Sequence, residues 1–153
     1  MTREYTLFWT ITGQPPGGIQ VTVDIPAGWT ETIDGMGSPT FTVPDLPGAL
    51  IAIVAIHAPG TSAADRLTWA LAKQFDADDL PTVERTPRGD GRMWAVHRPN
   101  GRLHARMFLP APHDSIVIAS VMTFTAPTLD PVPQVEPVFE TVRVERSRAK
   151  EQR

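Results

Sequence analysis

Two histidines are the residues of this chain whose types and spacing come closest to a metal site. His97 and His104 flank Pro99-Asn100-Gly101, and Asn-Gly is the preferred pair for a two-residue type I′ turn. Such a turn makes the two histidines direct cross-strand neighbours, and imidazole is a common ligand of zinc and copper. A structural zinc site needs four ligands. The sequence therefore leaves two alternatives, a weak metal site at His97 and His104 or two half-exposed surface histidines.

The other reactive side chains form no catalytic motif. The carboxylates of 76–79 lack the glycine and the distal glutamate of a calcium loop, no G-x-S-x-G occurs, and cysteine is absent. Glu31, Asp34 and Asp45 could act as acid and base, but no motif brings them together. The sequence predicts a protein that is not an enzyme and holds no metal or cofactor, with an unrecognised enzyme as an alternative.

The residue best suited to bind a partner is Trp69. On a helix from Ser62 to Phe75 it lies about 160° from the apolar Leu71, with Asp65 and Lys73 beside it. Large exposed aromatic residues are enriched at protein interfaces. The alternative is that a loop or the N-terminal strand covers Trp69 as part of the core.

Composition limits the classes of partner. The 153 residues carry a net charge of -3, which offers no electrostatic basis for binding nucleic acid or an anionic membrane surface. The longest apolar run, Ala49–Ile56, is too short to cross a bilayer, so we expect no membrane insertion and a cytoplasmic location. We predict one domain over residues 1–146 and a disordered charged tail over 147–153.

Hydrophobic patterning predicts several strands. Residues from Ile19 to Ile25 alternate between apolar and polar, as expected for a strand with one buried face. Ala49–Ile56 and Ser115–Phe124 are apolar almost throughout, which predicts central strands covered on both faces. Around the Asn-Gly turn, the same register places Trp94, Val96, Leu103, Ala105 and Met107 on one inward face.

Two helices complete the pattern. Ser62 followed by Asp65 predicts the start of the first helix. A second helix is expected to begin near Gln134, with Pro137 in its first turn and an apolar stripe of Val135, Val138, Phe139 and Val142. The sequence therefore predicts the α+β class, with a twisted, mostly antiparallel sheet of about six strands flanked by helices.

The segment Val23-Asp24-Ile25-Pro26-Ala27-Gly28-Trp29, followed by the predicted strand and helix order, resembles the PsbP-like superfamily, which includes the Ran-GTPase release factors. The other matching features are the Ser62–Phe75 helix, the Ile116–Phe124 strand and the Val135–Val142 stripe. The resemblance implies an α/β/α sandwich and a non-catalytic role, because relatives mostly bind other proteins. Some bacterial relatives are chaperones or immunity-type partners of secreted effectors.

The function predicted is a non-enzymatic interaction or accessory protein, in a bacterial secretion or effector system, that binds another protein or a second copy of itself. The alternative is a small-molecule or lipid-binding module with a pocket between sheet and helix. A filled space beneath Leu67 and Leu71 favours the first, and a deep apolar cavity there favours the second. A cleft that gathers His57, His97 or His104 with carboxylates would favour catalysis.

Overall fold

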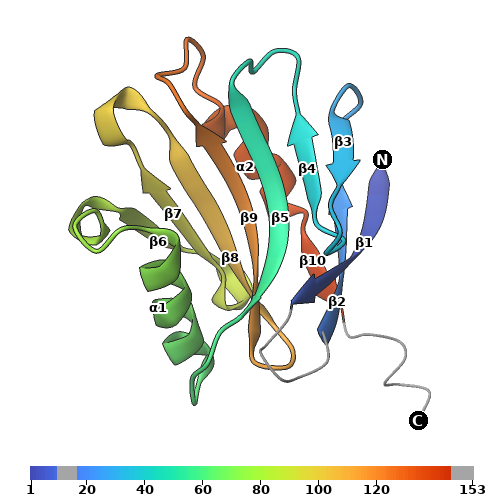
Figure 1. Ribbon diagram of the computed structural model, residues 1–153, viewed down its shortest axis with the longest axis vertical. Helices are drawn as coiled ribbons and strands as arrows, with labels where there is room; N and C mark the ends of the chain where they lie inside the picture. The colour runs from blue at the N-terminus through green and yellow to red at the C-terminus, as the bar shows by residue number, and fades with distance from the viewer. Residues whose placement is uncertain (10–16, 146–153) are drawn as a thin grey trace.

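Two antiparallel sheets of unequal size organise the chain. The computed structural model describes residues 1–9 and 17–145 (Figure 1). In chain order, the strands are β1 (Thr2–Trp9), β2 (Gly17–Asp24), β3 (Thr30–Ile33), β4 (Pro39–Thr42), β5 (Ala49–His57), β6 (Glu84–Pro87), β7 (Met93–His97), β8 (His104–Ala111), β9 (Ser115–Thr123) and β10 (Arg143–Glu145). The helices are α1 (Ala63–Gln74) and α2 (Val132–Glu140).

The sheet organisation confirms the predicted α+β class and adds a second sheet. One sheet has the order β3-β4-β5-β9-β8-β7-β6, and the other has the order β1-β2-β10. The expected sheet of about six strands corresponds to the seven-stranded sheet, and the part of the chain described adds a second sheet of three strands that was not expected. The Pro26–Trp29 corner is the reason, because it turns the chain away from β2 at Gly28 (φ +94°) and leaves β1 and β2 in a separate layer. The predicted tail, 147–153, lies outside the described residues.

The main core lies between the two sheets. Alternate residues of β2, Ile19, Val21 and Val23, are buried there as predicted, and Trp29 packs beside Phe41 with ring centroids 5.7 Å apart. The predicted stripe enters the same core through Val135, Val138 and Phe139 of α2 and through Val142, which follows the end of the helix. Figure 1 shows α2 behind the large sheet, on the side opposite α1.

The start of α2 corrects one expectation. The helix begins at Val132 instead of near Gln134, so Pro137 lies inside it and not in its first turn. The Asp130 carboxylate accepts a hydrogen bond from the Val132 N–H at 3.2 Å, which gives the helix an earlier start. Pro137 removes one backbone donor from the helix, and burial of the stripe on β2 and Trp94 offsets that loss.

The β7–β8 hairpin forms in the predicted register. Asn100 and Gly101 both have positive φ (54° and 78°), and the Arg102 N–H donates to the Pro99 carbonyl at 3.0 Å. Trp94, Leu103, Ala105 and Met107 are buried on the inward face, with Val96 packed against them. The opposite face is covered in part by α1.

The two long apolar strands are central, as predicted. β5 pairs along its whole length with β9. On β5, the residues that face the main core are buried, whereas Leu50, Ala52 and Val54 on the other face are half-buried. This asymmetry arises because α1 covers only one end of that face, as Figure 1 shows. Among the helices described, none has the length and hydropathy to cross a membrane.

Phe139 gives a test of the α2 contribution to the core. It is 1% exposed, and its ring lies 6.3 Å from that of Trp94. We expect Phe139→Ala to lower the free energy of unfolding by about 3–5 kcal/mol, measured by chemical denaturation. Phe124→Ala is the control, because Phe124 is 66% exposed and its loss should change that free energy by about 0.5 kcal/mol or less. Equal effects of the two substitutions would contradict the assigned core.

Candidate functional site

An open cleft of about 580 Å³ lies where the end of β5 meets α1. Its lining is mostly apolar and comes from four segments that are distant in sequence: β1, the β3–β4 turn, β5 and α1. The lining residues are Phe8, Trp9, Asp34, Met36, Ser38, Val54, Ala55, Ile56, His57 and Trp69. The cleft therefore exists only in the folded chain.

The floor of the cleft is the end of β5. The ladder between β4 and β5 pairs Thr40 with Ala52 and Phe41 with Ile51. The same register would next set Pro39 opposite Ile53, and proline has no N–H to donate. Within the described residues, 53–57 therefore form a ladder with β9 alone, and β1 packs beside β5.

The β3–β4 turn forms one wall. Asp34 Oδ1 accepts hydrogen bonds from the N–H groups of Met36 (2.8 Å) and Ser38 (3.0 Å). The Phe8 N–H donates to the Met36 carbonyl at 2.9 Å, which joins this turn to β1. Gly37 has φ +75°, and a Cβ there would lie 2.1 Å from the Thr6 carbonyl oxygen. Glycine is therefore required for this close approach.

A polar cluster between β1 and β3 supports that wall. Glu31 accepts hydrogen bonds from the Tyr5 hydroxyl and from Arg3, the latter at 3.0 Å. The bond from Tyr5, reinforced by Arg3, lowers the pKa of Glu31. Burial, followed by the nearby carboxylate, raises the pKa of Tyr5. All three groups are used to hold β3 against β1.

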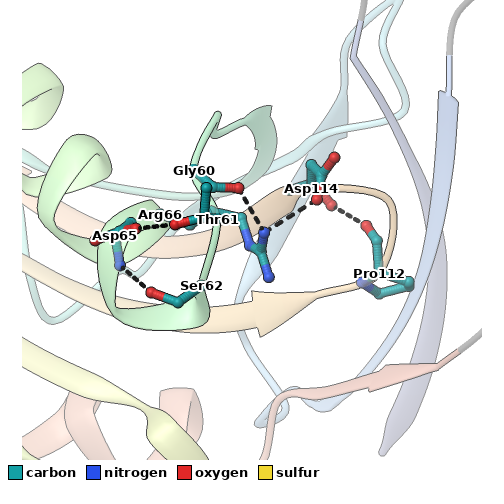
Figure 2. A network of polar contacts seen from close by, with 8 residues as sticks. Gly60, Thr61, Ser62, Asp65, Arg66, Pro112 and Asp114 are labelled. Atoms are coloured by element: carbon teal, nitrogen blue, oxygen red, sulfur yellow. Dashed lines mark hydrogen bonds and ion pairs between the residues drawn. The ribbon is translucent and has the colours of Figure 1, made fainter.

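The helix α1 forms the opposite wall, and a polar network fixes its start (Figure 2). The Asp65 N–H donates to Ser62 Oγ at 3.1 Å, and Thr61 Oγ1 donates to Asp65 Oδ2 at 2.6 Å. Arg66 donates to the Gly60 carbonyl at 3.2 Å and to Asp114, at the β8–β9 turn, at 3.0 Å. The predicted cap at Ser62 is therefore present, and Arg66 ties the helix to the sheet.

The structure separates the three residues predicted to form a partner site. Trp69 is half-buried against the apolar cluster that contains Val54 and Ile56, and it lines the cleft. Lys73 Nζ lies 5.5 Å from the centroid of the Trp69 ring. Asp65 belongs instead to the cap network, where its carboxylate accepts the Thr61 hydroxyl hydrogen bond. Trp69 and Lys73 thus stay together as a candidate contact, and Asp65 has a structural role.

The predicted histidine pair is adjacent, but the two side chains differ in burial. His97 and His104 are cross-strand partners with ring centroids 6.4 Å apart. His97 is 8% exposed and packs edge-on against Phe75, so the expectation of two half-exposed surface histidines is wrong for His97. His104 is half-buried, and burial lowers its pKa, with a further contribution from Arg106. In the part of the chain described, no group of three His, Asp or Glu residues is arranged to hold a metal ion.

The cleft also brings His57 near Asp34 and Ser38. This is the combination that would favour catalysis, but the described contacts do not join the three side chains. Asp34 Oδ1 is engaged by the amides of its own turn, and His57 Nδ1 is buried without a hydrogen-bond partner among the described residues. In the geometry described, no hydrogen bond therefore links His57 to either Asp34 or Ser38.

Sequence reasoning missed Phe8 and Met36 as cleft residues. Phe8 is 39% and Met36 is 36% exposed. One signal was present, since Phe8 alternates with the buried Tyr5, Leu7 and Trp9 and so had to point away from the core. Met36 gave no such signal, because its place in the cleft depends on how the β3–β4 turn meets β1.

Comparisons with known proteins bear on the fold alone. No protein-family model and no curated protein matches this sequence. A crystal structure from Bacteroides thetaiotaomicron VPI-5482, at 1.50 Å resolution, is similar to this chain with a TM-score of 0.51 and 16% identity. The similarity covers 83% of this chain and 46% of that one, so this chain spans about half the length of its structural neighbour.

Glu31 allows a pH-dependent test of the β1–β3 cluster. Its pKa in the folded state is lower than the ordinary value of 4.5, so its stabilising contribution is full above that value and is lost as pH falls through the folded-state pKa. We expect Glu31→Gln to reduce the free energy of unfolding by about 1 kcal/mol at pH 7. Denaturation across pH should show this difference disappearing in acid. Glu4→Gln, at an exposed position of β1, is the control. A difference that is constant with pH would show that ionisation of Glu31 is not involved.

Ser62 tests the anchoring of α1. We expect Ser62→Ala to lower the free energy of unfolding by about 1 kcal/mol, because the Asp65 N–H loses its acceptor. Thr68→Ala is the matched control, since Thr68 is exposed on the same helix and its hydroxyl bonds only the Ala64 carbonyl. That change should be neutral or slightly stabilising. Thermal or urea unfolding that gives equal effects for the two variants would contradict the cap assignment.

Proposed function

We propose that this chain is a non-enzymatic binding module that holds a segment of another protein in the cleft between α1 and the β3–β4 turn. The observation that carries the proposal is the cleft itself, which places Phe8, Met36 and Trp69 together around the end of β5. Accessible aromatic and methionine side chains that surround a recess are typical of protein-binding sites.

The packing beneath α1 supports a module that binds its partner in the cleft and not between the helix and the sheet. Leu71 is buried in a cluster with Phe75, Ala95, Phe108 and Ile118, so the space between this part of the helix and the sheet is filled. A filled space there is the condition that favours an adaptor over a ligand-binding module. The chaperone- or immunity-type role in a secretion or effector system, which the PsbP-like resemblance implies, remains part of the proposal.

A second candidate function is the binding of a small apolar molecule. The volume of about 580 Å³ is the observation in its favour, because it falls within the range of small-molecule sites. The cleft is open along one side, however, and small-molecule sites usually enclose most of their ligand. A polypeptide segment can extend beyond the opening, so we prefer a polypeptide to a small molecule as the ligand of this cleft.

Trp69→Ala tests the proposal. We expect the variant to fold and to bind the partner at least about thirtyfold more weakly, the loss typical of a buried aromatic contact. Affinity purification from the native cell would supply the partner, and titration of that purified partner would give the Kd.

Phe124→Ala is the matched control, because Phe124 is exposed and follows the end of β9 that is remote from His57. Its affinity should equal that of the unmodified chain. Light scattering would show whether the partner is a second copy, and native mass spectrometry would reveal a bound small molecule. A Trp69→Ala variant that keeps its partner and its oligomeric state would contradict the proposal.

A further inference from the structure

We infer that the partner segment is acidic, and that it runs from the cleft over an uncovered face of the large sheet so that its carboxylates lie against Lys73 and Arg106. This inference rests on the proposed function and names the chemistry of the partner. The uncovered face is the part of the large sheet that α1 leaves open next to the cleft. Its members are Leu50, Ala52 and Val54 of β5, Ser120 and Met122 of β9 and Arg106 of β8.

The burial of β9 shows where the cover of α1 ends. Ile116 and Ile118 are each 1% exposed and belong to the cluster that contains Leu71 of α1. Ser120 and Met122 point to the same face of the sheet but are only half-buried. Figure 1 shows α1 at one end of this face. Because a sheet buries its apolar face against another element, the open part offers apolar area to a partner.

The strand register makes the uncovered face continuous with the cleft. Cross-strand partners share one face of a sheet, so the pairs Ala52–Ser120 and Ser120–Arg106 form one row across β5, β9 and β8. Val54, two residues along β5 from Ala52, lies on the same side and lines the cleft. A segment that leaves the cleft over Val54 therefore comes next to the row that ends at Arg106.

Two cations border this row, and neither forms an ion pair with a carboxylate in the part of the chain described. Arg106 donates through Nε to Gln74 Oε1 at 3.1 Å and lies 5.0 Å from the centroid of the Phe75 ring, both at the C-terminal end of α1. Its Nη1 is buried without a hydrogen-bond partner among the described residues. Lys73 Nζ lies over the ring of Trp69, which lines the cleft.

The two uncompensated charges select an acidic occupant. Burial lowers the pKa of Arg106, because desolvation disfavours the charged form. A carboxylate of the partner would supply the missing counter-ion, whereas a neutral segment would bury Arg106 further without one. A basic segment would meet like charges at both Lys73 and Arg106. The carboxylate that lines the cleft, Asp34, belongs to the opposite wall, and its Oδ1 is already bonded by the amides of its own turn.

The experiment uses the full chain and a displayed library of random dodecapeptides. Peptides that are enriched on the unmodified chain and on Phe124→Ala, but not on Trp69→Ala, are synthesised and titrated. Each is titrated again on two matched pairs of variants, which circular dichroism first shows to be folded. Ala52→Glu and Ala52→Lys place opposite charges at one position of the uncovered face. Lys73→Glu and Arg143→Glu make the same change of charge beside this face and on β10, where Arg143 is exposed.

An acidic partner predicts that the peptides that depend on Trp69 carry a net negative charge. They should bind at least about tenfold more tightly to Ala52→Lys than to Ala52→Glu. Lys73→Glu should weaken binding at least about threefold, and Arg143→Glu should leave the Kd within about twofold of that of the unmodified chain. Added salt should weaken binding, because it screens the charges.

Peptides that depend on Trp69 but are neutral or basic would overturn the acidic partner and leave the proposed function intact. The same holds if binding does not distinguish the Ala52 variants, or, where one of these fails to fold, if Lys73→Glu and Arg143→Glu have equal effects. A dimer of the unmodified chain that Lys73→Glu dissociates, seen by light scattering, would assign the face to a second copy and also overturn the inference. Failure to enrich any peptide that depends on Trp69 would contradict the proposed function itself.

Discussion

Termination of the β4–β5 ladder at Pro39 is the constraint on which this side of the molecule depends. β5 continues to His57 because β9 pairs with it along its full length, whereas β4 cannot donate a further hydrogen bond once it reaches the proline. The residues that precede Pro39 turn at Gly37. The β3–β4 turn therefore contacts β1 instead of β5. The end of β5 thereby becomes the floor of a recess that β1, the β3–β4 turn and α1 surround.

Most polar groups around this recess are used to hold its walls in place. Glu31 joins β3 to β1, Asp34 closes the turn that carries Met36, and Arg66 ties the start of α1 to the β8–β9 turn. Because each of these side chains already has a hydrogen-bond partner within the chain, the walls of the recess are formed without a ligand. A preorganised recess loses less conformational entropy on binding than a disordered one, which suits the recognition of a flexible segment.

The sequence predicted those features that depend on local pattern. The α1 cap at Ser62, the Asn100-Gly101 turn and the buried stripe of α2 all follow from neighbouring residues, and the structure confirms them. Predictions from the sequence were wrong or incomplete where contacts between distant segments decide the structure. The second sheet depends on how the Pro26–Trp29 corner redirects the chain, and the burial of His97 depends on Phe75 from α1 packing over it.

The sequence by itself determined the α+β class and the two central strands, whereas Trp69, expected to face away from the apolar stripe of α1, packs against the same cluster as Leu71. The class and the strands follow from hydrophobic periodicity and turn chemistry, which act over a few residues. Only the tertiary structure decided that Trp69 lines the same recess as Phe8 and Met36, at the end of β5. The physical reason is that burial of a shared core brings distant segments together, and the cleft forms between these segments. No local sequence pattern encodes the distance from one such segment to another.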